Sequence, residues 1–463
     1  MRTFVAAVRD KYEYKKSEDG ASAAGDYGVV GAGLAGKKQA LDVLKMVYLP
    51  DSGIDSPGEA GEVASTCGAI AELDLAGNAF DSWPPLLAIT SQLTKLHWLG
   101  LDRMPLAPLA ALPDGFGAAA GGLRTLSVSS TGMAWEQLLL LSGAMPVLEE
   151  VRFSSNNVTT LMVGGSSTLP AGALAKVHSL YLEGNMLSSW NDVQPLGTLP
   201  ALALLNLNLN QLRAVPKPSA AAADGSPPPF GSLRQLMLKG NQIDAWATVD
   251  ALDAYPSLVE ARLTELPLTS SMSGAAARRV VIARMAKLRS LNGSEVRTRE
   301  REDAERFYLR QVAQEYPEGG LPDGAVVYPQ AEGDGAVDIS DDAPAAPKVD
   351  EYGRPLAADA PAGGATAPAA PPVLTVPEGE EWSALTTRHP RWAALLVLHG
   401  THVTRTVTQA SGGVIANELM ELHMRATSAE AAHLPTVTRK LPGGLPLKSI
   451  KLIACQLFKV ASP

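Results

Sequence analysis

Apolar side chains recur at a fixed spacing along the chain, and residues 177–190 show the pattern most clearly. Val177, Leu180 and Leu182 are followed by Asn185, in the spacing L-x-x-L-x-L-x-x-N. This spacing predicts a short strand in which Leu180 and Leu182 face a core while Tyr181 faces outward. The asparagine amide is expected to bond backbone groups that the turning chain leaves unpaired.

The same spacing can be placed eight times between residues 70 and 268. Its ninth position recurs at intervals of 25 to 31 residues and falls on Asn78, Met104, Thr131, Asn156, Asn185, Asn210, Asn241 and Leu266. An apolar residue stands two positions after each of them. Such a period is typical of leucine-rich repeats and is shorter than that of the helical repeats. The sequence therefore predicts an α/β leucine-rich-repeat solenoid, a horseshoe of about eight repeats over residues 70–275.

Large aromatic residues follow the turn in alternate repeats. They are Trp83, Trp135, Trp190 and Trp246. Flat side chains suit the convex layer, where each coil covers the next, so we interpret them as core residues rather than as a surface for stacking a ligand.

Both ends of the predicted solenoid carry amphipathic helices, as solenoid ends require because the last coil would otherwise expose its apolar face. Residues 1–69 form a lead-in whose Phe4, Val5, Val8 and Tyr12 predict a helix, followed by a strand at Val47 and Leu49. Residues 276–316 predict a helix, a degenerate coil at Leu288 and Leu291, a turn at Asn292 and Gly293, and a second helix. Ala304, Phe307, Tyr308 and Val312 of that second helix are expected to seal the last coil.

A glycine-rich stretch, VVGAGLAGKK, places Gly31, Gly33 and Gly36 in the spacing G-x-G-x-x-G, with Lys37 following as in a phosphate loop. Asp51 stands 20 residues after Gly31, where a ribose-binding acid would lie. However, too short an apolar run precedes the glycines, Lys38 replaces the required Ser or Thr, and no alternation of strand and helix follows. We therefore predict a flexible lead-in, and no cofactor.

The composition is that of a globular protein, with 46% hydrophobic residues and a net charge of −9. This acidic balance argues against nucleic-acid binding over the whole surface. The chain contains no run of 18 apolar residues, which is the length that a membrane-spanning helix requires. The two cysteines, Cys67 and Cys455, are too far apart and too few for a disulfide framework, which fits a reducing, cytoplasmic compartment.

Residues 278–310 depart from this balance, with ten Lys or Arg against five Asp or Glu. Two interpretations stay open, a solvated helical cap held by salt bridges and an electrostatic site for an acidic partner.

The outward positions of the predicted strands form one continuous face. Coil by coil they are Asp74, Gly100, Ser127, Arg152, Tyr181, Asn206, Met237 and Arg262, with Trp98 on the same face as Gly100. Trp, Tyr, Met and Arg are enriched at protein interfaces. We therefore predict a partner-binding surface made of Asp74, Trp98, Arg152, Tyr181, Asn206, Met237 and Arg262. The alternative is a solvated face with isolated aromatic residues.

Residues 317–379 are rich in Pro, Ala, Gly and Asp and predict a disordered linker. Residues 380–463 then predict a short helix containing Leu395, Leu396 and Leu398, strands over 418–426 and 436–441, and a helix over 447–458. Two strands and a helix are the opening half of a ubiquitin-like α+β domain, which predicts a partial domain at this end.

Catalytic signatures are missing from the sequence. The seven histidines form no pair at zinc-ligand spacing, and neither a G-x-S-x-G nor a Cys–His signature occurs. The sequence predicts no catalytic residue, no metal site and no enzyme activity.

Three stretches resemble the tubulin-folding cofactor E family. They are AELDLAGNAFDSW (71–83), LNGSEVRTREREDAERFYLR (291–310) and RHPRWAALLVLHG (388–400). In that family a Gly-rich cytoskeleton-associated module precedes the repeats and a ubiquitin-like domain follows them. No Gly-Lys-Asn-Asp-Gly motif of the first module occurs, so Met1 is expected to begin after it, and the ubiquitin-like domain is expected to be truncated.

The resemblance implies a function. It implies capture of α-tubulin, a complex with cofactors D and C and β-tubulin, assembly or disassembly of the heterodimer, and a cytoplasmic, cytoskeleton-associated location without nucleic acid or membrane. Two alternatives stay open. One is the cofactor E-like, tubulin-destabilising relative, and the other is a leucine-rich-repeat adaptor for phosphatase regulation or RNA processing.

Overall fold

The structure, a computed structural model, describes residues 1–13, 40–109, 111–166, 168–219, 227–322, 325–327, 373–400, 419–424 and 437–442. The chain forms two compact units, Met1–Glu305 and Arg306–Pro463. The glycine-rich stretch with Gly31, Gly33, Gly36 and Lys37 lies outside the described residues. So do Cys455 and the helix expected over 447–458.

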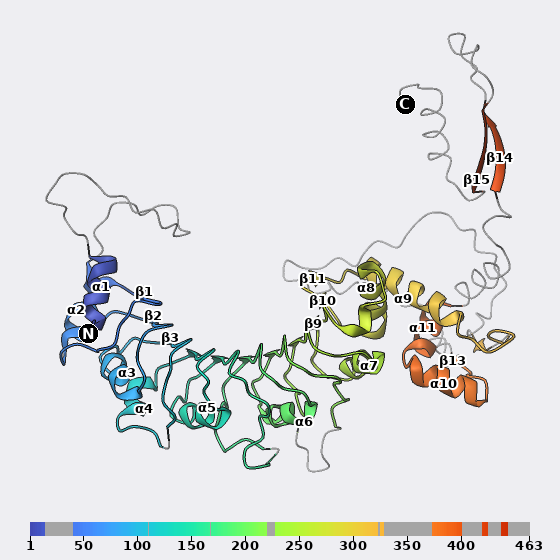
Figure 1. Cartoon of the computed structure of the whole chain (residues 1–463). Coiled ribbons are helices and arrows are strands. Elements are labelled where there is room, and N and C mark those ends of the chain that lie inside the picture. Colours follow the sequence, from blue (N-terminus) through green and yellow to red (C-terminus); the bar gives the residue numbers. More distant parts are fainter. Residues whose placement is uncertain are drawn as a thin grey trace, which may run out of the picture. The chain divides into compact units, whose positions relative to one another are not determined.

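The first unit is built on one sheet whose strands follow chain order (Figure 1). Its strands are β1 (Met46–Tyr48), β2 (Glu72–Asp74), β3 (Trp98–Gly100), β4 (Thr125–Ser127), β5 (Glu150–Arg152), β6 (Ser179–Tyr181), β7 (Leu204–Asn206), β8 (Gln235–Met237), β9 (Glu260–Arg262), β10 (Ser290–Leu291) and β11 (Ser294–Glu295). All neighbours pair in parallel except β10 and β11. The middle residues, such as Leu73, Leu99 and Leu126, stand opposite one another and are buried. The predicted leucine-rich-repeat solenoid and its register are confirmed.

Short helices form the other side of the coils (Figure 1). They are η1 (Leu41–Val43), α2 (Glu62–Cys67), α3 (Trp83–Thr90), α4 (Phe116–Ala120), α5 (Trp135–Ser142), α6 (Trp190–Val193), η2 (Gln194–Thr198), α7 (Trp246–Asp253) and η3 (Pro267–Thr269).

The tryptophans that begin several of these helices pack against aromatic rings of the next coil. The centroid of Trp83 lies 5.7 Å from that of Phe116, and the centroid of Trp135 lies 5.9 Å from that of Phe153. Trp83, Trp135 and Trp190 are buried, as the core interpretation predicts. Trp246 is only partly buried, and the guanidinium of Arg284 lies 5.1 Å from its ring centroid.

Buried asparagines bond one coil to the next, as predicted from the repeat. The amide nitrogen of Asn185 donates to the carbonyls of Phe153 and Leu182, both at 3.0 Å. Its oxygen accepts from the backbone N–H groups of Asn156 (3.0 Å) and Val158 (3.1 Å). Asn185 therefore satisfies four backbone groups that a turn would leave without partners.

The N-terminal helix closes one end of the sheet. Helix α1 (Phe4–Tyr12) buries Phe4, Val5 and Val8 in the common core, and Thr3 caps its first turn by accepting from Ala6 N at 3.2 Å. The hydroxyl of Tyr12 accepts from the N–H of Tyr48 at 2.9 Å, and Lys11 Nζ donates to the carbonyl of Tyr48 at 2.6 Å. The predicted helix and the strand β1 are confirmed, and side chains of α1 occupy backbone groups of the edge strand.

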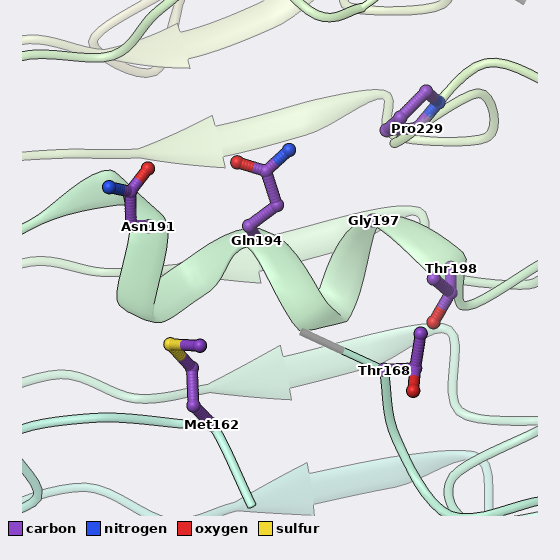
Figure 2. Close-up of a pocket in the computed structure, with 7 residues that line it drawn as sticks. All are labelled: Met162, Thr168, Asn191, Gln194, Gly197, Thr198 and Pro229. Atoms are coloured by element: carbon purple, nitrogen blue, oxygen red, sulfur yellow. The ribbon is translucent and has the colours of Figure 1, made fainter. Parts of the chain in front are cut away.

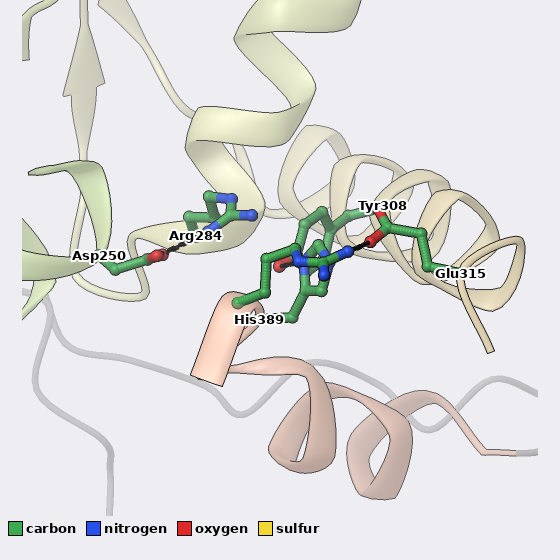
Figure 3. Close-up of polar contacts among 6 residues, drawn as sticks. Asp250, Arg284, Tyr308, Glu315 and His389 are labelled. Atoms are coloured by element: carbon green, nitrogen blue, oxygen red, sulfur yellow. Dashed lines mark hydrogen bonds and ion pairs between the residues drawn. The ribbon is translucent and has the colours of Figure 1, made fainter. Parts of the chain in front are cut away.

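The C-terminal cap consists of α8 (Gly274–Arg284), the β10–β11 turn and α9 (Thr298–Ala313). Arg278 joins its parts by bonding Glu300 Oε1 at 2.6 Å and the carbonyl of Leu291 at 2.9 Å. Arg284, which is 3% exposed, pairs with Asp250 at 2.6 Å (Figure 3). These pairs favour the salt-bridged interpretation of the basic stretch.

The seal of the last coil differs from the expectation. Ala304 joins the core shared by the coils, whereas Tyr308 and Val312 are buried in the second unit. Phe307 is only partly buried. The later turns of helix α9 belong to the second unit. Helical spacing alone could not identify the residues against which these turns pack.

The second unit also contains α10 (Glu380–Arg388), α11 (Trp392–His399) and two antiparallel pairs. The first pair is β12 (Val326–Val327) with β13 (Val373–Leu374), and the second is β14 (Leu419–Met424) with β15 (Val437–Pro442). The two strands expected near residues 418–441 are therefore present. The ubiquitin-like assignment stays a prediction.

Two details of this unit differ from the expectations. The short helix expected to contain Leu395, Leu396 and Leu398 is present as α11, but a second helix, α10, precedes it. The two are separated at His389 and Pro390, because proline lacks an N–H and disfavours helix in the residue before it. Leu395 and Leu396 are buried, whereas Leu398 is 67% exposed. The ends of the linker expected over 317–379 are paired, as β12 and β13.

Candidate functional site

The third residue of each strand forms a row across the inner side of the sheet. Successive strand partners place Tyr48, Asp74, Gly100, Ser127, Arg152, Tyr181, Asn206, Met237 and Arg262 in this order. Trp98 lies in the adjacent row, between Glu72 and Thr125. The structure thus brings all seven predicted partner-binding residues onto one face, which we call the inner face.

The predicted residues differ in their access to solvent. Arg152 and Arg262 are exposed, and Asp74, Trp98 and Tyr181 are partly buried. Asn206 is only 5% exposed and Met237 only 9%, which corrects the expectation that both offer surface to a partner. Strands lie about 4.8 Å apart, so larger side chains of adjacent coils shield smaller ones. The Asn206 amide also donates to Glu183 Oε2 at 3.0 Å.

A cation–π contact occupies the middle of the inner face. The guanidinium of Arg152 lies 5.6 Å from the ring centroid of Tyr181, and its Nε donates to Glu150 Oε1 at 2.8 Å. Burial and the nearby Glu150 carboxylate raise the pKa of Tyr181, against the effect of Arg152. The Arg152–Glu150 pair is partly exposed and adds little stability, but it orients the guanidinium over the ring.

An aromatic pair lies at the N-terminal end of the inner face. The rings of Tyr48 and Trp98 have centroids 6.4 Å apart and are tilted by 55°. The Tyr48 hydroxyl donates to Glu72 Oε2 at 3.0 Å. A Cβ on Gly100 would lie 2.8 Å from Cη2 of Trp98, so the indole lies against the backbone of Gly100.

Sequence reasoning missed Tyr48 and its neighbour Met46, although both are exposed, by 37% and 49%. The strand at Val47 and Leu49 was predicted, and the alternation of side chains along it would have placed Met46 and Tyr48 outward. Strand β1 was treated as part of the lead-in, so it was not included among the repeats.

Two carboxylates lie beside the aromatic pair. Asp74 Oδ1 accepts from the N–H of Ala76 at 2.9 Å, and Asp102 accepts from the Ser127 hydroxyl at 2.7 Å and the Ser129 N–H at 2.6 Å. Burial, with a contribution from Asp102, raises the pKa of Asp74. This end of the inner face is therefore aromatic and acidic.

Two pockets of the first unit lie near α6 and η2 rather than on the strand rows. One, of about 430 Å³, is lined by Met162, Thr168, Asn191, Gln194, Gly197, Thr198 and Pro229 (Figure 2). Another, of about 570 Å³, is lined largely by prolines, including Pro200, Pro227, Pro228 and Pro256. None of the described lining residues is charged, so neither pocket offers an acid, a base or a charged ligand contact.

Reactive side chains are sparse in the described part of the chain. No group of three or more His, Cys, Asp or Glu residues is placed there to hold a metal ion. Burial raises the pKa of the Cys67 thiol to about 11, so it stays protonated at neutral pH. Among the described helices, none is long and apolar enough to cross a membrane.

Comparison with known proteins gave weak likenesses to solved structures. No protein-family model matches the chain. The Drosophila melanogaster SNF/U2A' complex matches 39% of this chain and 92% of that chain, at 21% identity and a TM-score of 0.29. The leucine-rich repeat domain of APL1B matches 55% of this chain and 62% of that chain, at 20% identity and a TM-score of 0.33. These likenesses are too weak to indicate a function. The fold is defined by the register of the strands.

Curated relatives are more informative. "Tubulin-folding cofactor E" of Arabidopsis thaliana is 27% identical over 430 residues, which are 92% of this chain and 68% of the relative. "Tubulin-specific chaperone cofactor E-like protein" of Homo sapiens is 30% identical over 59% of this chain and 62% of the relative. "Tubulin-specific chaperone E" of Danio rerio is 30% identical over 66% of this chain and 58% of the relative.

The chain thus spans between 58% and 68% of the lengths of these three relatives. The chain is a homologue of the proteins named tubulin-folding cofactor E and tubulin-specific chaperone E.

Proposed function

We propose that this chain is a tubulin-folding cofactor that binds α-tubulin through the inner face. In this proposal it takes part in assembly or disassembly of the α/β-tubulin heterodimer with cofactors D and C, in the cytoplasm and in association with the cytoskeleton. It acts by binding and needs no catalytic residue or cofactor of its own.

The observation that carries this proposal is the continuous inner face. A ladder of parallel strands holds Trp98, Arg152, Tyr181 and Arg262 on one side of a rigid sheet. Aromatic and arginine side chains are the types that dominate binding energy at protein interfaces. The names of the relatives supply the partner, since they refer to tubulin.

The length of the match to the Arabidopsis relative supports cofactor E over the cofactor E-like relative. The Arabidopsis relative matches 92% of this chain, whereas the human cofactor E-like protein matches 59%. A match over 430 residues must extend beyond the repeats into the second unit.

The inner face can be tested with a variant in which Trp98, Arg152, Tyr181 and Arg262 are replaced together by Ala. We expect this variant to lose binding to α-tubulin, measured by co-purification, because the main aromatic and cationic contacts are removed. A matched control replaces Lys95, Glu136, Lys176 and Arg213 by Ala, since these are exposed residues outside the strands. The control should retain binding.

Two outcomes would contradict the proposal. Retained binding by the quadruple inner-face variant would show that the docking surface lies elsewhere. A pull-down from cytosol that enriched a phosphatase or RNA-processing proteins, and no tubulin, would instead favour an adaptor function.

A further inference from the structure

Charge is distributed unevenly along the inner face. Strand β2 carries the carboxylates of Glu72 and Asp74 on this face, and Asp102 stands two positions after β3. No Lys or Arg occupies the outward positions of these two strands or the position two residues after either strand. Basic residues occupy the same kinds of position only from β5 onward, and they are Arg152, Lys239 and Arg262. Acidic residues occur in that second half as well, namely Glu150, Glu183 and Glu260, so only the first half is acidic without compensation.

The nearest cations in the described part of the chain already have partners. Lys11 donates to the carbonyl of Tyr48, and Arg103 pairs with Asp51 at 2.9 Å. The ion pairs found among the described residues do not include Glu72, Asp74 or Asp102. In the described part of the chain, Glu72, Asp74 and Asp102 therefore form no ion pair, although Arg103 and Lys11 are near enough to lower the pKa of Asp74.

The aromatic pair gives this end a second and independent means of binding a cation. Aromatic faces attract ammonium and guanidinium groups within about 6 Å of the ring centroid, with tryptophan the most effective. Trp98 lies against Gly100, and the hydroxyl of Tyr48 is held by Glu72. Both rings are thus fixed before a ligand arrives, which lowers the entropic cost of binding.

We propose that Tyr48, Trp98, Glu72 and Asp74 form a receptor for a lysine or arginine side chain in a basic segment of the partner protein. The cation would lie against the rings and form ion pairs with the carboxylates. A flat guanidinium could both stack on an indole and bond a carboxylate. The identification of that partner as tubulin rests on the proposed function, whereas the receptor itself does not.

The raised pKa of Asp74 agrees with this assignment. Burial is the main cause that raises it, and the charges of Arg103 and Lys11 offset this effect only in part. A bound ammonium or guanidinium would stabilise the charged carboxylate. Because Asp74 is already partly desolvated in the free protein, less desolvation remains to be overcome when the cation binds.

The receptor can be tested directly with a short oligo-arginine peptide, and with an oligo-glutamate peptide as the probe of opposite charge. The test variant is Glu72→Gln with Asp74→Asn, which keeps the shapes and the acceptor oxygens. We expect it to bind oligo-arginine about 10-fold more weakly than the natural chain, a change equal to about 1.4 kcal/mol. Calorimetry measures the affinity, and a thermal melt checks that the variant folds.

The matched control is Glu183→Gln with Glu260→Gln, which removes the same charge from the other half of the inner face. It should bind oligo-arginine as the natural chain does. Trp98→Ala should weaken binding, and Trp98→Phe should restore much of it. Equal affinity of the Glu72/Asp74 variant and the natural chain, or equal binding of oligo-glutamate, would overturn the receptor.

A parallel titration with purified α/β-tubulin separates this inference from the proposed function. Loss of tubulin binding in the Glu72/Asp74 variant alone supports both. If the natural chain binds oligo-arginine through these carboxylates but does not bind tubulin, the receptor stands and the proposed function fails. If tubulin binds and oligo-arginine binding ignores the carboxylates, the proposed function stands and the receptor fails.

Discussion

Single residues hold the coils together through a small number of buried hydrogen bonds. Asn185 is 3% exposed and serves two neighbouring turns at once. At the last repeat the same role passes to Asn292 of the degenerate coil, whose oxygen accepts from the N–H of Leu263 at 2.8 Å. Where the repeat has Thr131 instead, the hydroxyl bonds the carbonyl of Val128 and the amide oxygen of Asn156, and it accepts from the N–H of Met133 at 3.3 Å.

Replacing Asn185 by Ala should therefore destabilise the first unit strongly. The change leaves two buried N–H groups and two carbonyls without this partner, and each such group costs about 1–3 kcal/mol. We expect a loss of at least about 2 kcal/mol in the free energy of unfolding, measured by urea titration. The control is Asn191→Ala at an exposed helical position, which should stay within about 0.5 kcal/mol. Equal effects of the two changes would contradict the role assigned to Asn185.

At the scale of elements, polar contacts decide how the helices of the second unit pack. Helix α9 contributes Tyr308, whose hydroxyl lies 2.7 Å from Nδ1 of the buried His389 at the end of α10 (Figure 3). Glu315, just beyond α9, lies 3.3 Å from Nε2 of that histidine and accepts from Arg388 at 2.6 Å. The rings of Trp382 and Trp392 stack alongside, with centroids 5.9 Å apart.

These contacts predict that α9 and α10 separate more readily in acid. Burial alone would raise the pKa of Glu315, but the hydrogen bonds and charges of His389 and Arg388 lower it below its ordinary value overall. A carboxylate with a lowered pKa stabilises the fold above its ordinary pKa, and this contribution disappears as the pH falls through the lowered value. The protection factors of the amides of residues 380–388, which are exchange rates corrected for the pH dependence of the intrinsic rate, should therefore fall in the natural chain as the pH drops below the ordinary glutamate pKa of about 4.3.

Glu315→Gln is the matched variant for this measurement. It lacks the titrating charge, so its protection factors at neutral pH should already be lower and should change less on acidification. An identical pH profile in the variant would exclude Glu315 as the responsible group.

At the scale of the whole first unit, a stacked array depends on its ends. Each coil buries its neighbours, so an uncovered coil exposes apolar surface, and an uncovered edge strand exposes backbone groups. Helix α1 meets both needs. It buries Phe4 and Val8 in the common core, and its Lys11 and Tyr12 bond the backbone of Tyr48 in β1.

Deleting Met1–Glu13 should therefore promote self-association through β1. We expect a larger mass in sedimentation than that of the full chain, together with a lower melting temperature. The control is Arg2→Ala with Asp10→Ala, which removes a largely exposed ion pair and keeps the helix. A deletion variant with the mass and the melting temperature of the full chain would show that α1 does not protect the edge.

The sequence by itself determined the coils of the first unit. The spacing of leucines and asparagines is local, and it sets which side chains face the core whatever lies farther along the chain. For this reason the register and the buried Trp83, Trp135 and Trp190 could be predicted. The helices at both ends followed from helical spacing instead, which did not reveal the contacts of α9. The row of outward residues from Asp74 to Arg262 followed from the same alternation.

Only the tertiary structure decided what this row presents to solvent. The burial of Asn206 and Met237 depends on side chains from adjacent coils, and their sizes do not follow from the repeat. Tyr48 and Trp98 meet although they are far apart in the chain, and Tyr308 bonds His389 across 81 residues. A periodic pattern fixes the direction of a side chain, whereas its neighbours come from distant segments that only folding brings into contact.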